Sequence, residues 1–232
     1  MKLITGDLSP YSAKIRMQLY AMGIEGVVFE LPLSFFMGKL TSYSPIGRIP
    51  ILEIEEGIIP ESEVIAEYLD DRYPEKSMVG DSAWTRSQVR LLSRIADVYL
   101  MNNIFMALPQ TNRKTRVDAV RDLLTAQMVR GMGALEHHIG LEGYAVGNKL
   151  TRADCTLVPA LFLCERTVPM LDVENPIVDT INVANYWEAI QRNEFAVKII
   201  EEMDQGLRER QDGTERKRIE AAIAEEKKKP MS

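Results

Sequence analysis

The chain has few of the residues from which metal sites and disulfide frameworks are built, with two cysteines and two histidines among 232 residues. Cys155 and Cys164 are nine residues apart on one expected helix, so they would lie on opposite faces, and the sequence contains no Cys-x-x-Cys motif. Neither a disulfide framework nor a dithiol redox site is therefore expected. His137 and His138 are adjacent and would point in different directions on a helix, which argues against a metal site.

Long apolar runs and an excess of positive charge are also absent. No run approaches the length needed to cross a bilayer, and residues 1–4 enter a strand directly instead of forming a charged and then apolar leader. The net charge is −6 at pH 7, whereas a general nucleic-acid binder needs a basic surface. We therefore expect a cytoplasmic, globular protein without a nucleic-acid or membrane partner.

The first 80 residues have the pattern of a small α/β domain. Short apolar runs and turn residues predict a strand, a helix, a second strand, a β-hairpin with its turn at Gly57, and a final helix capped by Ser62. The expected bounds are Lys2–Thr5, Pro10–Met22, Val27–Leu31, Pro50–Ile54 with Ile58–Ile59, and Glu63–Leu69, with a loop at Ser34–Gly47. A strand–helix–strand unit of this length implies a parallel strand pair. The order βαβ and then ββα is that of a thioredoxin-like domain, which we place at residues 1–78.

From about residue 82 the strand signals stop, and apolar residues recur at helical spacing. The expected helices are Trp84–Ala107, Arg113–His138 and Thr151–Val168, and Ala184–Met203 is a further amphipathic stretch. The third is apolar on nearly all sides and should be the buried centre of an all-helical domain at residues 84–206. A hinge at Tyr73–Ser77 would join the two domains. Residues 207–232 are mostly charged and are expected to be a solvated helix or a disordered tail.

A serine stands where the first strand delivers the chain to the first helix. Ser9 is a good N-cap, because its hydroxyl can accept from an orphan amide of the first turn, and Pro10 suits the first helical position. The positive end of the helix dipole and the unpaired amides there favour an anion. On these residues alone, the simpler interpretation is that Ser9 and Pro10 only begin a helix.

Two further segments carry groups that suit a peptide ligand. In Pro45–Leu52, Pro50 opens a strand after a Gly-containing turn, and a cis bond there would leave the backbone of Ile49 free to pair with an extended peptide. At a helix start, Glu61 could bind the ammonium group of an α-amino acid, and Ser62 with the free helix amides could bind its carboxylate. Each segment also has a structural interpretation, as a strand start or as a capped helix with an acidic neighbour.

Taken in order, these motifs resemble those of the soluble glutathione transferases. The resemblance rests on Ser9-Pro10-Tyr11-Ser12 with Arg16, on Pro45–Leu52, on Glu61-Ser62, and on Thr151-Arg152-Ala153-Asp154. The last segment opens the expected central helix and matches the family's buried N-capping box. The resemblance covers nearly the whole chain and implies an α/β thioredoxin-like N-terminal domain followed by an all-α helical bundle. It also implies glutathione as co-substrate, no metal, and a homodimer.

The resemblance assigns the catalytic role to Ser9. The spacing from Ser9 to Arg16 is like that of the serine classes, which include bacterial members, and in which the serine donates a hydrogen bond to the glutathione sulfur. That bond favours the thiolate, which is the nucleophile. Ser12 is the rival for this role, but it would lie inside the helix and point less directly at the ligand.

The remaining glutathione contacts follow the same resemblance. Ile49, before Pro50, matches the residue whose backbone pairs with the cysteinyl unit, and Glu61-Ser62 matches the γ-glutamyl site. The glycyl end departs from the family pattern, because Phe35 and Phe36 occupy the place of the polar or basic residue that several serine classes use. Lys39 or Arg48 could bind the glycyl carboxylate instead.

The acceptor pocket is expected to use Tyr11, the loop around Phe36, and the helix segment Met101–Met106. The mixed residues of that helix segment are Asn102, Asn103, Phe105 and Met106. Methionine adapts to ligands of varied shape. The same segment could equally be simple core.

The resemblance implies a detoxifying transferase whose thiolate attacks a small electrophile that is apolar or aromatic. Conjugation, dehalogenation, ether cleavage and glutathione-dependent isomerisation remain open. Zeta isomerases begin with serine–serine–cysteine, and Pro10 and Tyr11 replace the second and third members here, which disfavours isomerisation. Omega and beta classes use a cysteine at the place of Ser9, so deglutathionylation is not expected. The alternative is an interaction module without turnover, but such modules tend to lose the activating residue or the γ-glutamyl pair.

Overall fold

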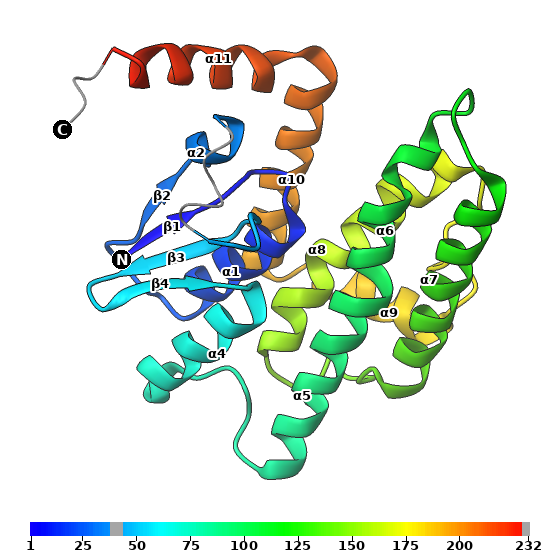
Figure 1. Ribbon diagram of the computed structural model, residues 1–232. Helices are drawn as coiled ribbons and strands as arrows, with labels where there is room; N and C mark the ends of the chain where they lie inside the picture. Colours follow the sequence, from blue (N-terminus) through cyan, green and yellow to red (C-terminus); the bar gives the residue numbers. More distant parts are fainter. Residues whose placement is uncertain (38–43, 229–232) are drawn as a thin grey trace. The chain divides into compact units, whose positions relative to one another are not determined.

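The computed structural model describes residues 1–37 and 44–228, and the chain divides into two compact units (Figure 1). The first unit contains Met1–Pro74 and the C-terminal residues from Glu201, and the second contains Glu75–Ile200. The boundary between Pro74 and Glu75 falls within the segment expected to be a hinge. The C-terminal residues therefore belong with the N-terminal sheet.

The first unit is built on a four-stranded sheet with the order β2-β1-β3-β4. Its N-terminal elements are β1 (Lys2–Ile4), α1 (Pro10–Ala21), β2 (Val28–Glu30), α2 (Leu33–Phe36), β3 (Ile51–Ile54), β4 (Gly57–Pro60) and α4 (Ser62–Arg72), followed by a short 3₁₀ helix, η1 (Pro74–Lys76). β1 pairs in parallel with β2 and antiparallel with β3, and β3 and β4 form the hairpin. The thioredoxin-like order βαβ then ββα is confirmed. The short helix α2 overlaps the start of the segment that was expected to be loop.

The core of this unit lies where the central strands meet α1 and α4. Side chains that are fully buried or nearly so come from β1, β3 and both helices, and include Leu3, Ile4, Ile51, Leu52, Ile15, Met17, Ile65 and Leu69. α4 contacts α1, β3 and β4. The apolar residues of the central strands therefore hold the ends of the strands in fixed positions, and those ends carry the predicted motifs.

The second unit is all helical, which confirms the second part of the fold prediction. Its elements are α5 (Ala83–Ile95), η2 (Ala96–Met101), α6 (Asn102–Ala107), η3 (Leu108–Thr111), α7 (Asp118–His138), α8 (Arg152–Thr167), η4 (Val168–Leu171) and α9 (Ile181–Ile190). η2 is a turn of π-helix between α5 and α6, which the sequence pattern of Trp84–Ala107 did not indicate. α7 begins five residues later than expected, because Arg113 and Arg116 pair with Asp172 instead of continuing the helix.

α8 is the buried centre of the second unit, as predicted, with 14 of its 16 residues buried. The predicted capping box is present, and the Thr151 amide donates to Asp154 Oδ2 at 2.7 Å. Asp154 Oδ1 also accepts from the Ala145 amide at 2.7 Å and from the Tyr186 hydroxyl at 3.1 Å. Burial of the Asp154 carboxyl raises its pKa to about 6. The three hydrogen bonds above and a fourth from the Thr151 hydroxyl act in the opposite direction, because they lower this pKa.

The amphipathic stretch at Ala184–Met203 belongs to two helices. α9 ends at Ile190, and α10 (Glu194–Asp212) starts after a break. Asn193 Oδ1 accepts from the amides of Phe195 at 3.0 Å and Ala196 at 3.3 Å, so Asn193 caps a new helix. α10 runs on into the first unit, where Gly213 leads to α11 (Thr214–Glu226).

α11 is not isolated from the rest of the first unit. It contacts α2, beside which it runs in Figure 1. Its Arg218 pairs with Asp7 at 2.6 Å. The charged C-terminal residues thus form a helix with specific partners. Within the described residues, no helix combines the length and apolar character needed to cross a bilayer.

Candidate functional site

The three N-terminal motifs flank one end of the sheet. Ile4 of β1 lies opposite Ile51 of β3, and Ile51 lies opposite Pro60 of β4. β1 ends, β3 begins and β4 ends in this single row. The segments that follow β1, precede β3 and follow β4 contain the three motifs, so the register brings them to the same edge of the sheet.

The helices α1 and α4, which begin at this edge, lie side by side and run in the same direction. Lys14 is buried and pairs with Glu63, and one turn further along, Gln18 Nε2 donates to the Ala66 carbonyl at 3.0 Å. Because later residues of one helix meet later residues of the other, the two N-termini are adjacent. Each N-terminus presents the positive end of a helix dipole. The region in front of them favours a negatively charged group.

Ser9 is the N-cap of α1, as predicted, with Pro10 in the first turn. Its Oγ accepts from the Ser12 amide at 3.3 Å. Because Oγ acts there as an acceptor, the hydroxyl hydrogen remains available for donation to a ligand. Ser12, the rival for the catalytic role, is fully buried, and its Oγ accepts from the Gly6 amide at 3.4 Å. That contact gives Ser12 a structural partner inside the loop.

The peptide bond between Ile49 and Pro50 is cis, and Pro50 directly precedes β3. The Ile49 side chain packs against Ile4 and Ile51. Among residues 1–37 and 44–228, neither the amide nor the carbonyl of Ile49 has a backbone hydrogen-bond partner. An added methyl group on Gly6 would lie 3.0 Å from Ile49 Cδ1, so the loop before Ser9 and the cis segment are in close contact.

The start of α4 differs from the prediction, in which Ser62 was the N-cap. The N-cap is Glu61, which makes no side-chain capping bond, and Ser62 is the first helical residue and is buried. Glu61 is exposed and has φ 69° and ψ 117°. A non-glycine residue in that region costs roughly 1–3 kcal/mol, and such residues cluster at ligand sites. A carboxylate and a buried hydroxyl therefore stand at the N-terminus of α4.

Arg16 organises the loop before Ser9, a role that the sequence did not reveal. Its side chain is 4% exposed. It donates to Thr5 Oγ1 at 2.8 Å and to the carbonyls of Gly6 and Asp7, each at 3.0 Å. A planar guanidinium spreads five donors over three nitrogen atoms in a fixed fork, whereas an ammonium has three donors on one atom. Arg16 thus fixes the backbone that leads into the cap.

The remaining predicted residues of the first unit lie near its surface. Arg48 and Phe36 are exposed, and Tyr11, in the first turn of α1, is half-buried. Lys39 lies outside the described residues. The glycyl contact and the acceptor contacts predicted for this unit therefore stay predictions.

In the second unit, the predicted acceptor segment follows the π-helical turn η2. Asn102 donates to the thioether of Met106 at 3.7 Å; Met106 is exposed and Phe105 is half-buried. Asn103 is buried, and its amide donates to the carbonyls of Val98 at 3.1 Å and Tyr99 at 2.9 Å. Asn103 thus satisfies carbonyls that the π-helical turn displaces. Such turns occur frequently at functional sites.

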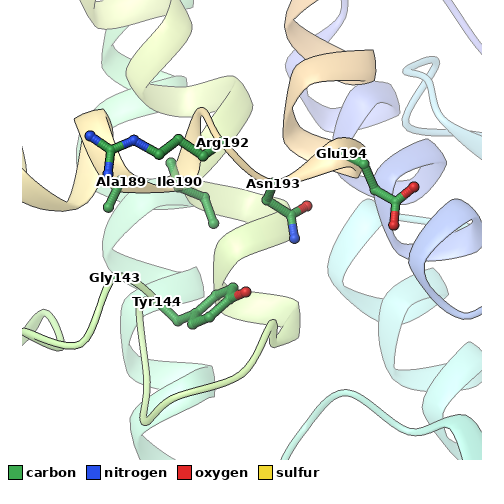
Figure 2. Close-up of a pocket in the computed structure, with 7 residues that line it drawn as sticks. All are labelled: Gly143, Tyr144, Ala189, Ile190, Arg192, Asn193 and Glu194. Carbon is green, nitrogen blue, oxygen red and sulfur yellow. The ribbon is translucent and has the colours of Figure 1, made fainter.

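A cavity of about 420 Å³ in the second unit contains none of the predicted site residues. It is lined by Gly143, Tyr144, Ala189, Ile190, Arg192, Asn193 and Glu194. Figure 2 shows the side chains of Tyr144 and Asn193 pointing toward one another, while Glu194 points away. Asn193 acts there as the N-cap of α10. The position of this polar side chain beside the cavity is therefore explained by its role in the fold.

The two cysteines of α8 are buried, and neither forms a disulfide. Burial raises the pKa of the Cys164 thiol to about 12. A thiol protonated at neutral pH and shielded from solvent is not a nucleophile. The Cys164 thiol is therefore not a candidate nucleophile.

A thioredoxin-like unit with a capped serine, followed by a helical unit, defines the class of this protein. The sequence matches the family models described as glutathione S-transferase, N-terminal domain, over residues 3–77, and glutathione S-transferase, C-terminal domain, over residues 95–194. The chain belongs to the glutathione S-transferase family, which confirms the resemblance drawn from its motifs.

The proteins to which this chain is similar have names that describe different functions. A maleylacetoacetate isomerase of Pseudomonas aeruginosa is 28% identical over 182 residues, covering 74% of this chain and 85% of that protein. A stringent starvation protein A homolog of Coxiella burnetii is 25% identical over 212 residues, covering 90% of this chain and 95% of that protein. A Methylobacterium radiotolerans glutathione S-transferase, crystallised with glutathione sulfonate, has a TM-score of 0.73 at 17% identity, covering 86% of this chain and 93% of that one.

Proposed function

We propose that the protein binds glutathione at this edge of the sheet and that Ser9 activates the glutathione thiol as a thiolate. One observation carries this proposal. Two parallel helices begin side by side at the end of the sheet where Ser9 caps one of them and the backbone of Ile49 lacks a described partner. This arrangement supplies a hydrogen-bond donor, positive dipole ends and a free strand edge to one tripeptide.

The chemistry assigned to Ser9 is stabilisation of charge on sulfur. A free thiol has a pKa of about 8.5, so little of it is ionised at neutral pH. A hydrogen bond from the Ser9 hydroxyl favours the thiolate by about 1.5–3 kcal/mol, because one partner is charged. The thiol proton passes to solvent, and the sulfur electron pair then forms a bond to an electrophilic carbon. The leaving group, where there is one, departs with the electrons of its bond.

The neighbouring groups of the protein would bind the other parts of glutathione. The backbone of Ile49 pairs with the cysteinyl unit as an added strand. The Glu61 carboxylate binds the γ-glutamyl ammonium, and Ser62 with the first amides of α4 binds the α-carboxylate. Arg48 and Lys39 are the candidates for the glycyl carboxylate, and Tyr11 and Phe36 are candidates for the acceptor side.

The activating role is tested by Ser9→Ala, with Ser12→Ala as its matched control. Ser9→Ala should raise the pKa of the bound thiol and lower turnover of a generic aryl halide, while the affinity for glutathione changes little. Ser12→Ala should leave the thiol pKa unchanged. Unaltered turnover in Ser9→Ala, or a larger effect in Ser12→Ala, would remove Ser9 from the mechanism.

The γ-glutamyl role is tested by Glu61→Ala. Because Glu61 would bind a part of glutathione that does not react, its loss should appear mainly as a higher KM for glutathione. An unchanged KM would exclude Glu61 from the site. The two variants thus separate binding from activation.

The acceptor and the reaction subtype require a screen of substrates. Aryl halides, epoxides, β-aryl ethers and isothiocyanates cover conjugation, dehalogenation and ether cleavage. Because the Pseudomonas aeruginosa relative is named an isomerase, a cis-alkene diacid joins this panel. Substrates attacked by thiolate should all share the dependence on Ser9.

A second candidate function is an interaction or regulatory module without turnover. The Coxiella burnetii relative, which covers nearly the whole chain, has a name that does not describe an enzyme. The presence of Ser9 and Glu61-Ser62 favours the transferase. A glutathione-affinity resin separates the two functions, because a module with a dead site should flow through.

We also propose a cytoplasmic homodimer. Exposed apolar side chains follow α7 and the turn before it, namely Val117, Val120, Leu123 and Val129. A second copy of this chain is the occupant that the family resemblance implies for such a surface. Sedimentation should show a dimer, and Leu123→Glu should weaken it. A monomer in wild type would contradict this part of the proposal.

A further inference from the structure

The loop that leads from β1 to Ser9 is held by residues from the other end of the sequence. Glu202 of α10 accepts from Arg16 Nε at 2.8 Å and from the Tyr20 hydroxyl at 2.9 Å. Arg16 in turn holds the carbonyls of Gly6 and Asp7. α10 therefore acts on the loop through a buried guanidinium.

One turn along α10, Gly206 brings the two backbones together. An added methyl group on Gly206 would lie 3.2 Å from Asp7 Cβ and 3.2 Å from the Leu8 amide nitrogen. These separations are tighter than ordinary van der Waals contact, so a side chain at this position would require the loop or the helix to shift by a few tenths of an ångström. The loop is thus packed directly on the helix backbone.

α11 makes the third contact with the same loop. Arg218 lies 2.6 Å from Asp7 Oδ2 and 3.3 Å from Glu209 Oε2. The turn between α10 and α11 is fixed by Arg210, which donates to both carboxylate oxygens of Glu215 at 2.8 and 2.9 Å. A bidentate pair of this kind defines geometry as well as energy. Arg218 is therefore positioned by the helix pair and not merely by its own flexible side chain.

The charge on Asp7 gives these contacts a consequence for chemistry. Asp7 stands two residues before Ser9, close to where a thiolate would form, and a nearby carboxylate disfavours that anion. The charged groups around the loop are Arg16, Arg218, Glu202 and Glu209. Arg218 is the cation that pairs with the Asp7 carboxylate itself, because Arg16 bonds its backbone carbonyl.

We infer that residues 201–226 complete the proposed glutathione site, and that Arg218 is a positioning residue that acts on Ser9 through Asp7. This inference rests on the proposed function. Arg218 neutralises the carboxylate beside the thiolate and restrains the loop that aims the serine hydroxyl. The C-terminal helix is thus part of the thiol-activating apparatus.

Arg218→Met tests this role, with Arg216→Met as the matched control on the same helix. Arg216 is 85% exposed and pairs with Glu220 within α11, so its loss removes the same charge without touching the loop. Arg218→Lys is the conservative variant, because an ammonium still neutralises Asp7. The readouts are the pKa of bound glutathione thiol, followed by the absorbance of its thiolate, and the pH profile of kcat.

Arg218→Met should raise the thiol pKa, so that turnover at about pH 6.5 falls roughly three- to tenfold and recovers as the pH rises. Arg216→Met should match wild type, and Arg218→Lys should retain most of the activity. Hydrogen exchange of the amides at residues 5–12, measured without glutathione, should accelerate in Arg218→Met and stay unchanged in Arg216→Met. A structural defect elsewhere would not shift the thiol pKa and the loop exchange together.

The inference is overturned if Arg218→Met leaves both the thiol pKa and the loop exchange as in wild type, or if Arg216→Met changes them equally. Failure of the proposed function is a distinct result, in which the wild-type protein itself binds no glutathione. In that case the inferred role in thiol activation falls with it. The exchange comparison still decides whether α11 restrains the Ser9 loop.

Discussion

Replacing Arg16 by methionine tests the physical basis of the site, because this one side chain joins the Ser9 loop to the C-terminal helices. Methionine keeps much of the length and packing of the arginine stem and removes the guanidinium. The substitution leaves Thr5 Oγ1 and the carbonyls of Gly6 and Asp7 without their donor. It also leaves the Glu202 carboxylate without its cation.

The expected loss follows from the burial of the two partners. Removing one member of a buried ion pair costs about 3–5 kcal/mol. Arg16 is 4% exposed and Glu202 is 29% exposed, so the remaining carboxylate can be partly rehydrated. The loss should therefore lie at the lower end of the range, at about 3 kcal/mol. Arg16→Lys keeps the charge, but its three donors on one atom cannot replace the bonds to the four acceptors of Arg16, so it should lose about half of that free energy.

Urea unfolding followed by far-ultraviolet circular dichroism measures this loss. The two tryptophans, Trp84 and Trp187, both lie in the second unit, so their fluorescence reports on that unit. If the loss of unfolding free energy is larger by circular dichroism than by tryptophan fluorescence, the effect of the substitution lies in the first unit. A loss under about 1 kcal/mol, or equal losses in Arg16→Met and Arg16→Lys, would refute the assigned role.

The second unit supplies two further predictions. Gly131→Ala should lower the free energy of unfolding by about 1–3 kcal/mol, because the new methyl group would lie 2.5 Å from Tyr99 Cβ. Gly133 lies on the same helix, and a methyl group added there would have nothing within 4 Å, so Gly133→Ala should be neutral or stabilise by up to about 1 kcal/mol. If urea unfolding shows that both variants change the free energy of unfolding in the same direction, the close contact at Gly131 is contradicted. Burial raises the pKa of Asp154 to about 6 from 3.8, so the folded state retains a proton that the unfolded state releases. Stability contributed by Asp154 should therefore fall by about 3 kcal/mol as the pH rises from about 4 to 7. The free energy of unfolding of wild type should fall by this amount relative to that of Asp154→Asn. If the difference in unfolding free energy between the two proteins stays constant across this pH range, Asp154 does not contribute in this way.

Local signals were enough to predict most of the elements of the N-terminal unit, including the cap of α1. A cap residue followed by proline marks the start of α1, and alternating apolar residues around a glycine turn mark the β3–β4 hairpin. The cis proline was indicated by its place at the start of a strand. Each of these features is determined by residues that are close together in the sequence, so each can be recognised from the sequence alone.

Features that depend on distant residues could not be predicted in this way. Arg16 and Glu202 are separated by 186 residues, and Arg218 and Asp7 by 211. A charged segment looks the same in sequence whether its arginines face water or a partner. The break at Asn193 was missed because apolar residues continue at helical spacing on both sides of the cap.

The conformation of Glu61 and the π-helical turn η2 were missed for another reason. Positive φ at a glutamate is unfavourable locally and is imposed by the junction of β4 and α4. A π-helical turn shifts the helical register without altering composition. Both are deviations from regular structure; Glu61 was itself predicted to contact a ligand, and η2 directly precedes the predicted acceptor segment.

The pKa of the glutathione thiol bound to wild type and to Ser9→Ala is the measurement that tests the central claim most directly. The thiolate absorbs in the ultraviolet, so a pH titration of each complex yields the value. Wild type should bind the thiol with a pKa about 1–2 units below the free value of about 8.5, and Ser9→Ala should return it toward that value while still binding glutathione. Equal thiol pKa values in the two complexes would contradict the assignment of Ser9 as the activating group.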